Sequence, residues 1–568
     1  MSRAISRLLL IISTSFLLAS CGEEQVSAPQ KTDDQLAVDA LFSEWDKPGS
    51  PGASVAIIRD GKIDYSSAYG EAQVEYGIPI TPETIFHVAS ITKQFTAFGI
   101  ALLAERGELD LDDDIRKYIP EVPDFGTTIT LRQLGHHTSG LRDQWSLLGL
   151  GGWRLDDVIT LPQVMKLIER QEALNFPPNS KYTYSNTGFT LMAETIARVG
   201  GKPFPIWMEE NVFLPLGMDN TLIYDDHEKI VNNRAYSYRF GEDGLKKAVL
   251  SYAVAGATSL FTTADDLSIW LNNYSTMRVG GETVNTIMKT KGILNSGEEI
   301  EYAFGVENSE YRGLNTLGHG GADAGFRSNV IYFPEHKLGV TVLSNLASFD
   351  PGGLARKIAD IYLGEHMTPL EEKEAPVERM ALEAVEVSGD VLNSYTGLYG
   401  FVDYPGLTIE IILEDGALKG TDPNDISHTF KAVAADKFTS DSTETETTAT
   451  FTPNDTGSFD MTLSVGQELK LNRIEQIDFS DDQLNAYVGD YYSRELETSY
   501  RVKINDGGLI AVHSRHPDIT LNALGVDLFS ASAWFFREAT FERNEAGDVS
   551  VMSVSSGRVT DLKFEKIE

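Results

Sequence analysis

The chain has 568 residues, of which 42% are hydrophobic, 10% aromatic and 23% charged. This composition is that of a folded protein and excludes intrinsic disorder, while the length indicates about three to four domains. The formal net charge of −37 at pH 7 argues against binding to nucleic acid or to an anionic membrane surface. It favours either cationic, amine-bearing substrates or a surface that keeps the protein soluble.

The first residues have the pattern of an exported protein. Basic residues precede the apolar run Leu8 to Leu18, which is too short to span a membrane. The next residues, Leu18-Ala19-Ser20-Cys21, resemble a bacterial lipobox, in which the cysteine becomes the lipidated first residue. Cys21 is the only cysteine of the chain, so no intramolecular disulfide can form. The alternative is a plain cleaved signal with an incidental cysteine.

We therefore predict an exported protein that is anchored by lipid at Cys21 on the periplasmic side of a bacterial membrane. Gly22 resembles the sorting pattern of outer-membrane lipoproteins and favours that membrane. The corresponding segments are a signal peptide over residues 1–20 and a lipidated tether over residues 21–35.

Strand and helix patterns alternate along the first part of the mature chain. Ala53 to Arg59 and Ile63 to Ala68 flank Asp60-Gly61, a strong hairpin signal. Further patterns predict helices at Leu36 to Trp45, Phe86 to Leu103, Phe189 to Val199 and before Asn272, and strands at Asn329 to Phe333 and Gly339 to Ser344. Such a mixture predicts an α/β (α+β) layered domain over residues 36–365.

The second part of the chain contains an internal repeat of short strand patterns. Leu392-x-x-Tyr395-x-Gly397-x-Tyr399 recurs about 90 residues later as Leu484-x-x-Tyr487-x-Gly489-x-Tyr491. Two further pairs keep the same order and nearly the same spacing, Thr450-Phe451 with Thr540-Phe541 and Leu469-Lys470 with Leu562-Lys563. We predict a linker over residues 366–385 and two small, lipocalin-like antiparallel β-barrels over residues 386–476 and 477–568.

Ser90 and Lys93 begin the helical pattern over Phe86 to Leu103. Residues three apart share one face of a helix, and free N–H groups at a helix start favour developing negative charge. The pair therefore predicts an activated nucleophile beside an amine. On these two residues alone, an ordinary amphipathic helix with a solvated lysine explains the pattern equally well.

Downstream motifs add Tyr184, Asn186 and His319-Gly320-Gly321. Each has an ordinary structural reading by itself: a core tyrosine, a helix N-cap or a loop histidine. Together and in this order they resemble the serine β-lactamase and penicillin-binding-protein superfamily, especially its class C and D-aminopeptidase (peptidase S12) branch. That superfamily carries Ser-x-x-Lys, Tyr-x-Asn and a Lys/His-x-Gly on an edge strand.

The resemblance implies a serine hydrolase that forms an acyl-enzyme through Ser90. Lys93 or Tyr184 acts as the general base, and the sequence leaves this choice open because the groups titrate together. Asn186 orients Lys93 and a substrate amide. His319 is the third motif, Gly320 and Gly321 let the strand approach the substrate, and the N–H of Ala322 joins that of Ser90 as an oxyanion hole.

His319 departs from the β-lactamases, whose third motif usually has lysine. This difference weakens the case for penicillin-like substrates, because a lysine carries a permanent charge suited to a carboxylate. A catalytic domain followed by two barrels is similar to the D-aminopeptidases, in which a loop of the last barrel enters the cleft. Ser514 to Asp518, with Arg515 as a substrate-binding residue, is the candidate loop, although a plain hairpin turn is an equal alternative.

The function predicted from these features is hydrolysis of small peptides, amides or esters, with a D-aminopeptidase-like activity favoured. The enzymatic alternatives are an esterase and a penicillin-recognising D-Ala carboxypeptidase or β-lactamase. The non-enzymatic alternative is a surface scaffold with a vestigial hydrolase domain. No cofactor and no metal site are predicted, because the His136-His137 pair lacks a third ligand at useful spacing.

Overall fold

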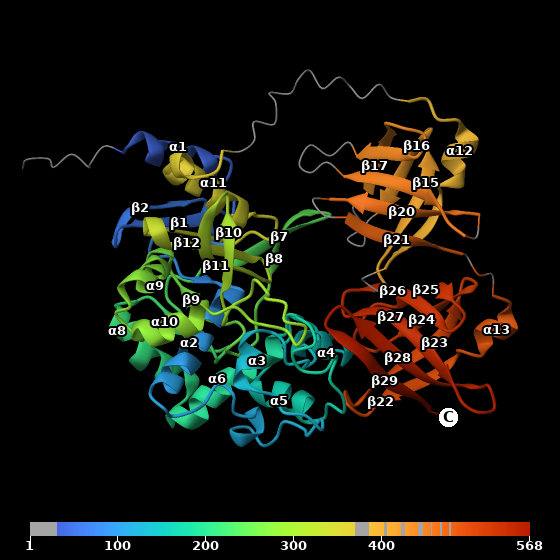
Figure 1. Ribbon diagram of the computed structural model, residues 1–568, viewed down its shortest axis with the longest axis horizontal. Helices are drawn as coiled ribbons and strands as arrows, with labels where there is room; N and C mark the ends of the chain where they lie inside the picture. The colour runs from blue at the N-terminus through green and yellow to red at the C-terminus, as the bar shows by residue number, and fades with distance from the viewer. Residues whose placement is uncertain are drawn as a thin grey trace, which may run out of the picture.

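The computed structural model describes residues 31–369, 385–402, 406–421, 427–440, 447–455, 457–465, 468–475, 477 and 479–567. The predicted signal peptide, the lipidation at Cys21 and most of the predicted linker lie outside these residues and stay predictions. Figure 1 shows a mixed domain followed by two β-barrels, one beside the other. None of the described helices has both the length and the apolar character needed to cross a membrane.

A six-stranded antiparallel sheet organises the first domain, in the order β10-β11-β12-β13-β1-β2. The strands are β10 (Glu307–Tyr311), β11 (Leu314–Asp323), β12 (Phe326–Phe333), β13 (Leu338–Ser344), β1 (Ala53–Arg59) and β2 (Lys62–Tyr69). Every residue of β13 and all but the last of β1 are buried, as expected for central strands covered on both faces.

Helices cover both faces of this sheet (Figure 1). On one face α1 (Asp33–Phe42) packs with α11 (Pro351–Leu363), and the side chains of both join the cores of β1 and β13. On the other face α9 (Ala264–Thr276) packs against β1 and β13, and α2 (Thr92–Glu105) lies beneath it. Because α2 is buried from Thr92 to Leu103 on all sides, its apolar residues face core rather than water in every direction.

The first domain contains further helices, whose apolar side chains join the same core. They are α3 (Leu131–Gly135), α4 (Gln144–Leu150), α5 (Leu161–Glu169), α6 (Asn186–Gly200), α7 (Phe204–Met208), α8 (Leu214–Leu216) and α10 (Gly281–Lys289). Short strand pairs lie between them: β3 (Glu71–Gln73) with β4 (Ile78–Pro79), β7 (Ser237–Gly241) with β8 (Gly244–Ala248), and β9 (Leu260–Thr262) between β5 (Phe86–His87) and β6 (Leu222–Ile223).

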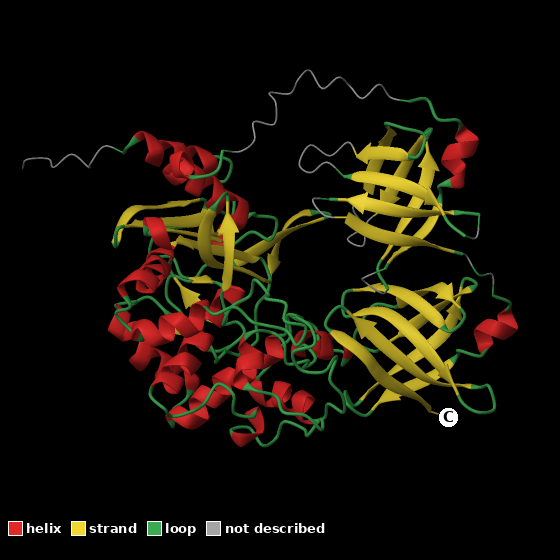
Figure 2. Ribbon diagram, viewed as in Figure 1, coloured by secondary structure: helices red, strands yellow, loops and turns green. Residues whose placement is uncertain are grey.

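The remaining strands close into two eight-stranded barrels, which Figure 2 shows as almost entirely strand. The first contains β14 (Gly397–Phe401), β15 (Thr408–Glu414), β16 (Ala417–Thr421), β17 (Ser427–Ala432), β18 (Lys437–Ser440), β19 (Thr448–Pro453), β20 (Phe459–Ser464) and β21 (Glu468–Ile474). The second contains β22 (Gly489–Ser493), β23 (Thr498–Asn505), β24 (Gly508–Val512), β25 (Ile519–Gly525), β26 (Leu528–Ala533), β27 (Phe536–Arg543), β28 (Val549–Ser556) and β29 (Val559–Ile567). The predicted fold class is confirmed.

The sequence repeat corresponds to the same structural device at the entrance of each barrel. A short helix, α12 (Gly389–Ser394) or α13 (Asp481–Asn485), leads into the first strand. The hydroxyl of Tyr399 donates to the carbonyl oxygen of Tyr395 at 2.8 Å, and that of Tyr491 donates to the carbonyl oxygen of Tyr487 at 2.6 Å. These tyrosines therefore recur because each closes a barrel end with a buried hydrogen bond.

The second barrel is docked on the helical side of the first domain, against α4 and α5 (Figure 1). Arg142 forms an ion pair with Glu495 at 2.7 Å, and both side chains are nearly inaccessible, at 2% and 7% exposure. Tyr500 donates to the carbonyl oxygen of Leu150 at 3.2 Å. A buried charge pair of this kind requires close and permanent contact, because neither charge can return to water without separating the domains.

Candidate active site

Ser90 lies in a tight turn at the start of α2. The turn is a short 3₁₀ segment, Ala89–Ile91, and Ala89 has φ of 49°, in the left-handed region. This conformation costs a residue with a Cβ about 1–2 kcal/mol. Hydrogen bonds hold it in place, because Thr92 donates to the carbonyl oxygen of Ala89 at 2.5 Å and Ser328 to that of Val88 at 2.9 Å. The fold thus presents the Ser90 hydroxyl at a helix start.

Lys93 is fully buried one turn after Ser90. Its Nζ lies 3.1 Å from Ser90 Oγ, 2.8 Å from Asn186 Oδ1 and 2.8 Å from the carbonyl oxygen of Ala257. Burial holds the pKa of this amine well below its ordinary value, with Asp143 opposing the shift and Arg558 adding to it. The solvated lysine that an ordinary helix would carry is absent here, since the amine has no access to water.

Asn186 bridges Lys93 to a carboxylate that the sequence motifs did not include. Asp143 Oδ2 accepts hydrogen bonds from the backbone N–H and from Nδ2 of Asn186, both at 2.7 Å. The other oxygen, Oδ1, caps α4 by accepting from the N–H groups of Trp145 at 3.0 Å and Ser146 at 3.3 Å. Because Nδ2 faces Asp143, the Asn186 carbonyl oxygen is directed at Lys93.

Tyr184 lies close to the amine of Lys93 and the guanidinium of Arg558. Lys93 Nζ is 4.7 Å and the Arg558 guanidinium 5.1 Å from the centre of its ring. Burial raises the pKa of the phenol above its ordinary value, while the nearby Ser90 hydroxyl and the charge of Arg558 act against this rise. The buried ring of His137 packs against Tyr184 at 4.2 Å. Tyr184 is therefore a neutral phenol at neutral pH.

His319 is held as a neutral imidazole on β11. Burial, assisted by the charge of Lys93, lowers the pKa of His319 to about 4. Nδ1 lies 2.5 Å from the carbonyl oxygen of Gly320 and Nε2 lies 2.9 Å from the hydroxyl of Tyr302. Because a neutral ring that donates from Nδ1 carries no proton at Nε2, Nε2 accepts the hydrogen bond from the Tyr302 hydroxyl. The third motif thus supplies no positive charge to the cavity.

The register of β11 frees the backbone of Ala322. Asp323 and Phe326 close a two-residue turn between β11 and β12, so the N–H of Ala322 points away from β12. On the other side, the pairing with β10 ends at Gly318. The third motif was expected on an edge strand. The edge strand of this sheet is β10, however, and β11 has an unpaired side only beyond Gly318. A Cβ at Gly321 would lie 2.3 Å from the carbonyl oxygen of Val88, which explains this glycine.

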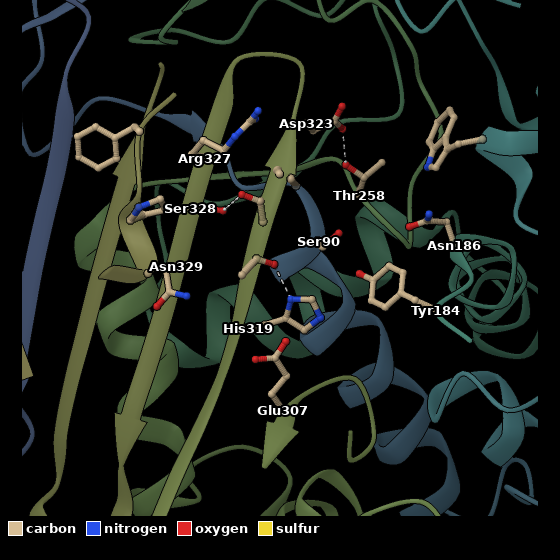
Figure 3. Close-up of a pocket in the computed structure, with 18 of the residues that line it drawn as sticks. Ser90, Tyr184, Asn186, Thr258, Glu307, His319, Asp323, Arg327, Ser328 and Asn329 are labelled. Atoms are coloured by element: carbon tan, nitrogen blue, oxygen red, sulfur yellow. Dashed lines mark hydrogen bonds between the residues drawn. The ribbon is translucent and has the colours of Figure 1, made fainter. Parts of the chain in front are cut away.

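A cavity of about 890 Å³ is lined by Ser90, Tyr184, Asn186, and His319 to Ala322 of β11. In Figure 3, Tyr184 and His319 lie on either side of Ser90, and Glu307 lies beyond His319. The second barrel completes the lining with Trp534, from the turn between β26 and β27, and Arg558, from the turn between β28 and β29. Within the described residues, no group of three or more His, Cys, Asp or Glu side chains is arranged to hold a metal ion.

Arg515 does not line this cavity. Its guanidinium forms an ion pair with Asp157 at 2.6 Å and lies over the ring of Trp153. The neighbouring His516 Nε2 lies 2.7 Å from the carbonyl oxygen of Gly149. The loop from Ser514 to Asp518, which joins β24 to β25, therefore contacts the first domain outside the site. The turns of this barrel that reach the cavity are the later ones, β26–β27 and β28–β29.

Sequence reasoning missed Asp143, Glu307 and Arg558. Asp143 follows the His137 turn and precedes an apolar helix, so an N-cap signal was available for it. Glu307 and Arg558 carry no local signal. They reach the cavity only because β10 lies beside β11 and because the second barrel docks beside Tyr184.

Comparison with known proteins identifies the first domain. The sequence profile of the family described as Beta-lactamase matches residues 38–363. The chain belongs to the beta-lactamase family. This beta-lactamase-family domain contains Ser90, Lys93, Tyr184, Asn186 and His319, whereas both barrels lie outside the match.

The relatives of this beta-lactamase-family protein include several D-aminopeptidases. It is 28% identical over 365 residues to the D-aminopeptidase of Gluconobacter oxydans (strain 621H), covering 64% of this chain and 66% of that protein. It is 26% identical over 330 residues to penicillin-binding protein 4* of Bacillus subtilis (strain 168), covering 54% of this chain and 71% of that protein. The D-aminopeptidase of Brucella anthropi is 28% identical, and the match covers 61% of this chain and 64% of that protein. The chain thus spans about two thirds of the length of these D-aminopeptidases.

Solved structures support the same fold. The octameric penicillin-binding protein homologue from Pyrococcus abyssi superposes with a TM-score of 0.53 at 24% identity, covering 77% of this chain and 99% of that chain. The D-amino acid amidase from Ochrobactrum anthropi SV3, complexed with L-phenylalanine amide, gives a TM-score of 0.51 at 24% identity over 59% of this chain and 100% of that chain. The predicted β-lactamase-like domain is thereby confirmed.

Proposed function

We propose that this protein is a serine hydrolase that cleaves small amides and peptides with a free D-amino-acid N-terminus through an acyl-enzyme on Ser90. The observation that carries the proposal is the environment of Lys93. A neutral amine has two N–H donors and one lone pair. Asn186 Oδ1 and the carbonyl oxygen of Ala257 accept the two donors, both at 2.8 Å, which leaves the lone pair for Ser90 Oγ at 3.1 Å.

In this proposal Lys93, rather than Tyr184, is the base for acylation. Its pKa is lowered by burial, whereas that of the Tyr184 phenol is raised. Lys93 removes the proton as Ser90 Oγ attacks the scissile carbonyl carbon. The N–H groups of Ser90 and Ala322 stabilise the oxyanion, and the loss of one such donor typically costs on the order of 3 kcal/mol of transition-state stabilisation.

Tyr184 then transfers a proton to the leaving nitrogen. Its hydroxyl points toward Ser90 (Figure 3) and its ring centre lies 4.7 Å from Lys93 Nζ, so the proton taken by Lys93 can return through it. The C–N bond breaks, the amine departs and Ser90 keeps the acyl group as an ester. A water molecule, activated by the same groups in reverse, hydrolyses the ester and regenerates Ser90.

The cavity supports recognition of the substrate amine by Glu307. Asp323 Oδ2 already lies 3.0 Å from His87 Nε2 and 3.1 Å from the Thr258 hydroxyl. Asp350 caps α11. Among the described residues the Glu307 carboxylate has no hydrogen bond or ion pair, and its exposed side chain lines the cavity, so it is open to the ammonium group of a substrate. The D-aminopeptidase relatives support this choice of substrate.

The test is release of p-nitroaniline from D-alanine and L-alanine p-nitroanilide, with nitrocefin and p-nitrophenyl butyrate measured in parallel. We expect D-selective release that Ser90→Ala abolishes and that Ser180→Ala, at an exposed serine outside the cavity, leaves unchanged. Turnover of nitrocefin or of the butyrate ester without anilide release would replace the proposal with a β-lactamase or an esterase. No Ser90-dependent turnover of any substrate would favour a scaffold with a vestigial site.

A further inference from the structure

Arg558 is the residue through which the second barrel reaches the catalytic groups. It lies at the tip of the β28–β29 turn, and its guanidinium carbon is 5.1 Å from the centre of the Tyr184 ring. Its carbonyl oxygen accepts hydrogen bonds from the N–H of Asp143 at 3.1 Å and from Asn175 Nδ2 at 2.9 Å. The backbone of this turn is thus fixed to the same aspartate that orients Asn186, so the side chain has a defined place in the cavity.

The guanidinium donors of Arg558 are open, unlike those of the arginines around it. Within the described part of the chain, this guanidinium forms no hydrogen bond and no ion pair, and Tyr184 is its one ring contact. By contrast, Arg142 is paired with Glu495 and Arg515 with Asp157. Arg327, also in the cavity lining, donates to the carbonyl oxygens of Ala324 and Phe326. Arg558 therefore offers a planar set of donors that suits a carboxylate.

The position of Arg558 assigns this carboxylate to one side of the scissile bond. The Tyr184 hydroxyl faces Ser90 (Figure 3) and, in the proposed mechanism, protonates the leaving nitrogen. When the leaving group is an amino acid, its α-carboxylate is only two bonds from that nitrogen and so lies beside Tyr184. His319 cannot take this carboxylate by charge, because its ring is neutral and both nitrogens already have partners.

We propose that Arg558 binds the α-carboxylate of the leaving group. The substrates favoured by this site are then short peptides whose leaving group is a free amino acid, rather than simple amides or esters. Glu307 and Arg558 would hold the two charged ends of such a peptide with Ser90 at the bond between them. This inference rests on the proposed function, since it presupposes acyl transfer to Ser90, and it adds a residue of the second barrel to substrate binding.

The test compares D-alanyl-glycine with D-alanyl-glycinamide, which differ only in the leaving-group carboxylate. kcat/KM for both is measured by chromatography of released D-alanine, using the whole 568-residue chain and its variants. We expect the wild type to favour the free acid by about 10- to 100-fold, as is typical of a charge-assisted hydrogen-bonded pair. Arg558→Gln should bring the ratio close to one by lowering turnover of the free acid, and Arg558→Lys should restore part of the preference.

Arg515→Gln is the matched control, because it removes a guanidinium from the same barrel face outside the cavity and should keep the wild-type ratio. A wild type that prefers the glycinamide, or an Arg558→Gln variant with the wild-type ratio, would overturn the inference. An equal fall in kcat/KM for both substrates in Arg558→Gln would also overturn the inference, since the guanidinium would then act through Tyr184 alone. Turnover that survives in Ser90→Ala would instead reject the proposed function. Thermal unfolding of each variant identifies any that fails to fold.

Discussion

Asp143 and Asn186 are joined by two hydrogen bonds of 2.7 Å, one to the backbone N–H and one to the side-chain amide of Asn186. This doubled contact fixes which end of the amide faces Lys93, and the Asp143 carboxylate also stabilises a positive charge on that amine. The orientation and the charge of the proposed base are therefore both controlled by a residue that does not touch the substrate.

Asp143→Asn should lower kcat/KM by about 10- to 100-fold, because the Asn186 amide loses its fixed orientation. It should also move the acidic limb of the kcat/KM profile to lower pH. Lys93 must be neutral to act as a base, and Asp143 raises its pKa, so removal of the carboxylate lets the amine lose its proton at lower pH. The measurement is kcat/KM from pH 5 to 10. An acidic limb that stays in place would show that another group controls it.

Lys93→Arg should reduce kcat by about 10²- to 10⁴-fold, the usual contribution of general base catalysis. An arginine places a permanent positive charge near Asn186, because its guanidinium cannot lose its proton at any ordinary pH. Pre-steady-state acylation with a chromogenic amide gives the rate of the step concerned. Acylation at the wild-type rate would mean that Lys93 serves by charge and that Tyr184 is the base.

Glu307→Gln should raise KM for D-alanine p-nitroanilide by about tenfold and leave that of the N-acetylated anilide unchanged, because only the former carries an ammonium group. In the wild type, partial desolvation and the nearby charge of Glu301 raise the pKa of Glu307. The carboxylate is thus neutralised on acidification earlier than an ordinary glutamate, and KM for the amine should rise at correspondingly higher pH. Glu310→Gln, on the same strand but outside the cavity, is the control.

Arg142→Met should destabilise the docked second barrel by on the order of 3–5 kcal/mol, since it leaves Glu495 charged and buried. The Arg142→Met/Glu495→Met double variant should recover much of this loss. Chemical unfolding measures the loss of stability, and limited proteolysis shows whether the two domains have separated. If the single variant unfolds like the wild type, the ion pair does not hold the interface.

Gly149→Val should also displace the second barrel, in this case by steric conflict. A Cβ at Gly149 would lie 2.8 Å from Cβ of Phe535, next to Trp534 in the cavity wall. We expect a lower melting temperature and a changed KM, both partly restored by Phe535→Ala. Gly364→Ala, where nothing lies within 4 Å, should behave as the wild type. A Gly149→Val variant with unchanged KM would show that the wall position is independent of this contact.

The features that could be predicted from sequence are those encoded locally. Ser90 and Lys93 are one helical turn apart, and the hairpin around Asp60-Gly61 forms β1 and β2. The barrels were predictable because each repeats its own closing tyrosines.

What could not be predicted depends on docking between distant segments. Glu307 becomes part of the cavity through the pairing of β10 with β11, and Arg558 through the seating of the second barrel near Tyr184. Arg515 and Arg558 look alike in sequence, as arginines between strand patterns. Only the packed structure separates the one that meets Asp157 from the one that faces the cavity.

The two turns that carry Trp534 and Arg558 belong to a different domain from every group that handles the scissile bond. The part of the cavity wall that these two turns supply is therefore encoded in a separate stretch of the gene, whereas Glu307 lies in the same domain as Ser90. Such an arrangement lets selection alter the side chains at the hairpin tips while the Asp143 N–H stays bonded to the carbonyl oxygen of residue 558. For protein engineering, a small library confined to these two tips is the economical place to search for new substrate preferences.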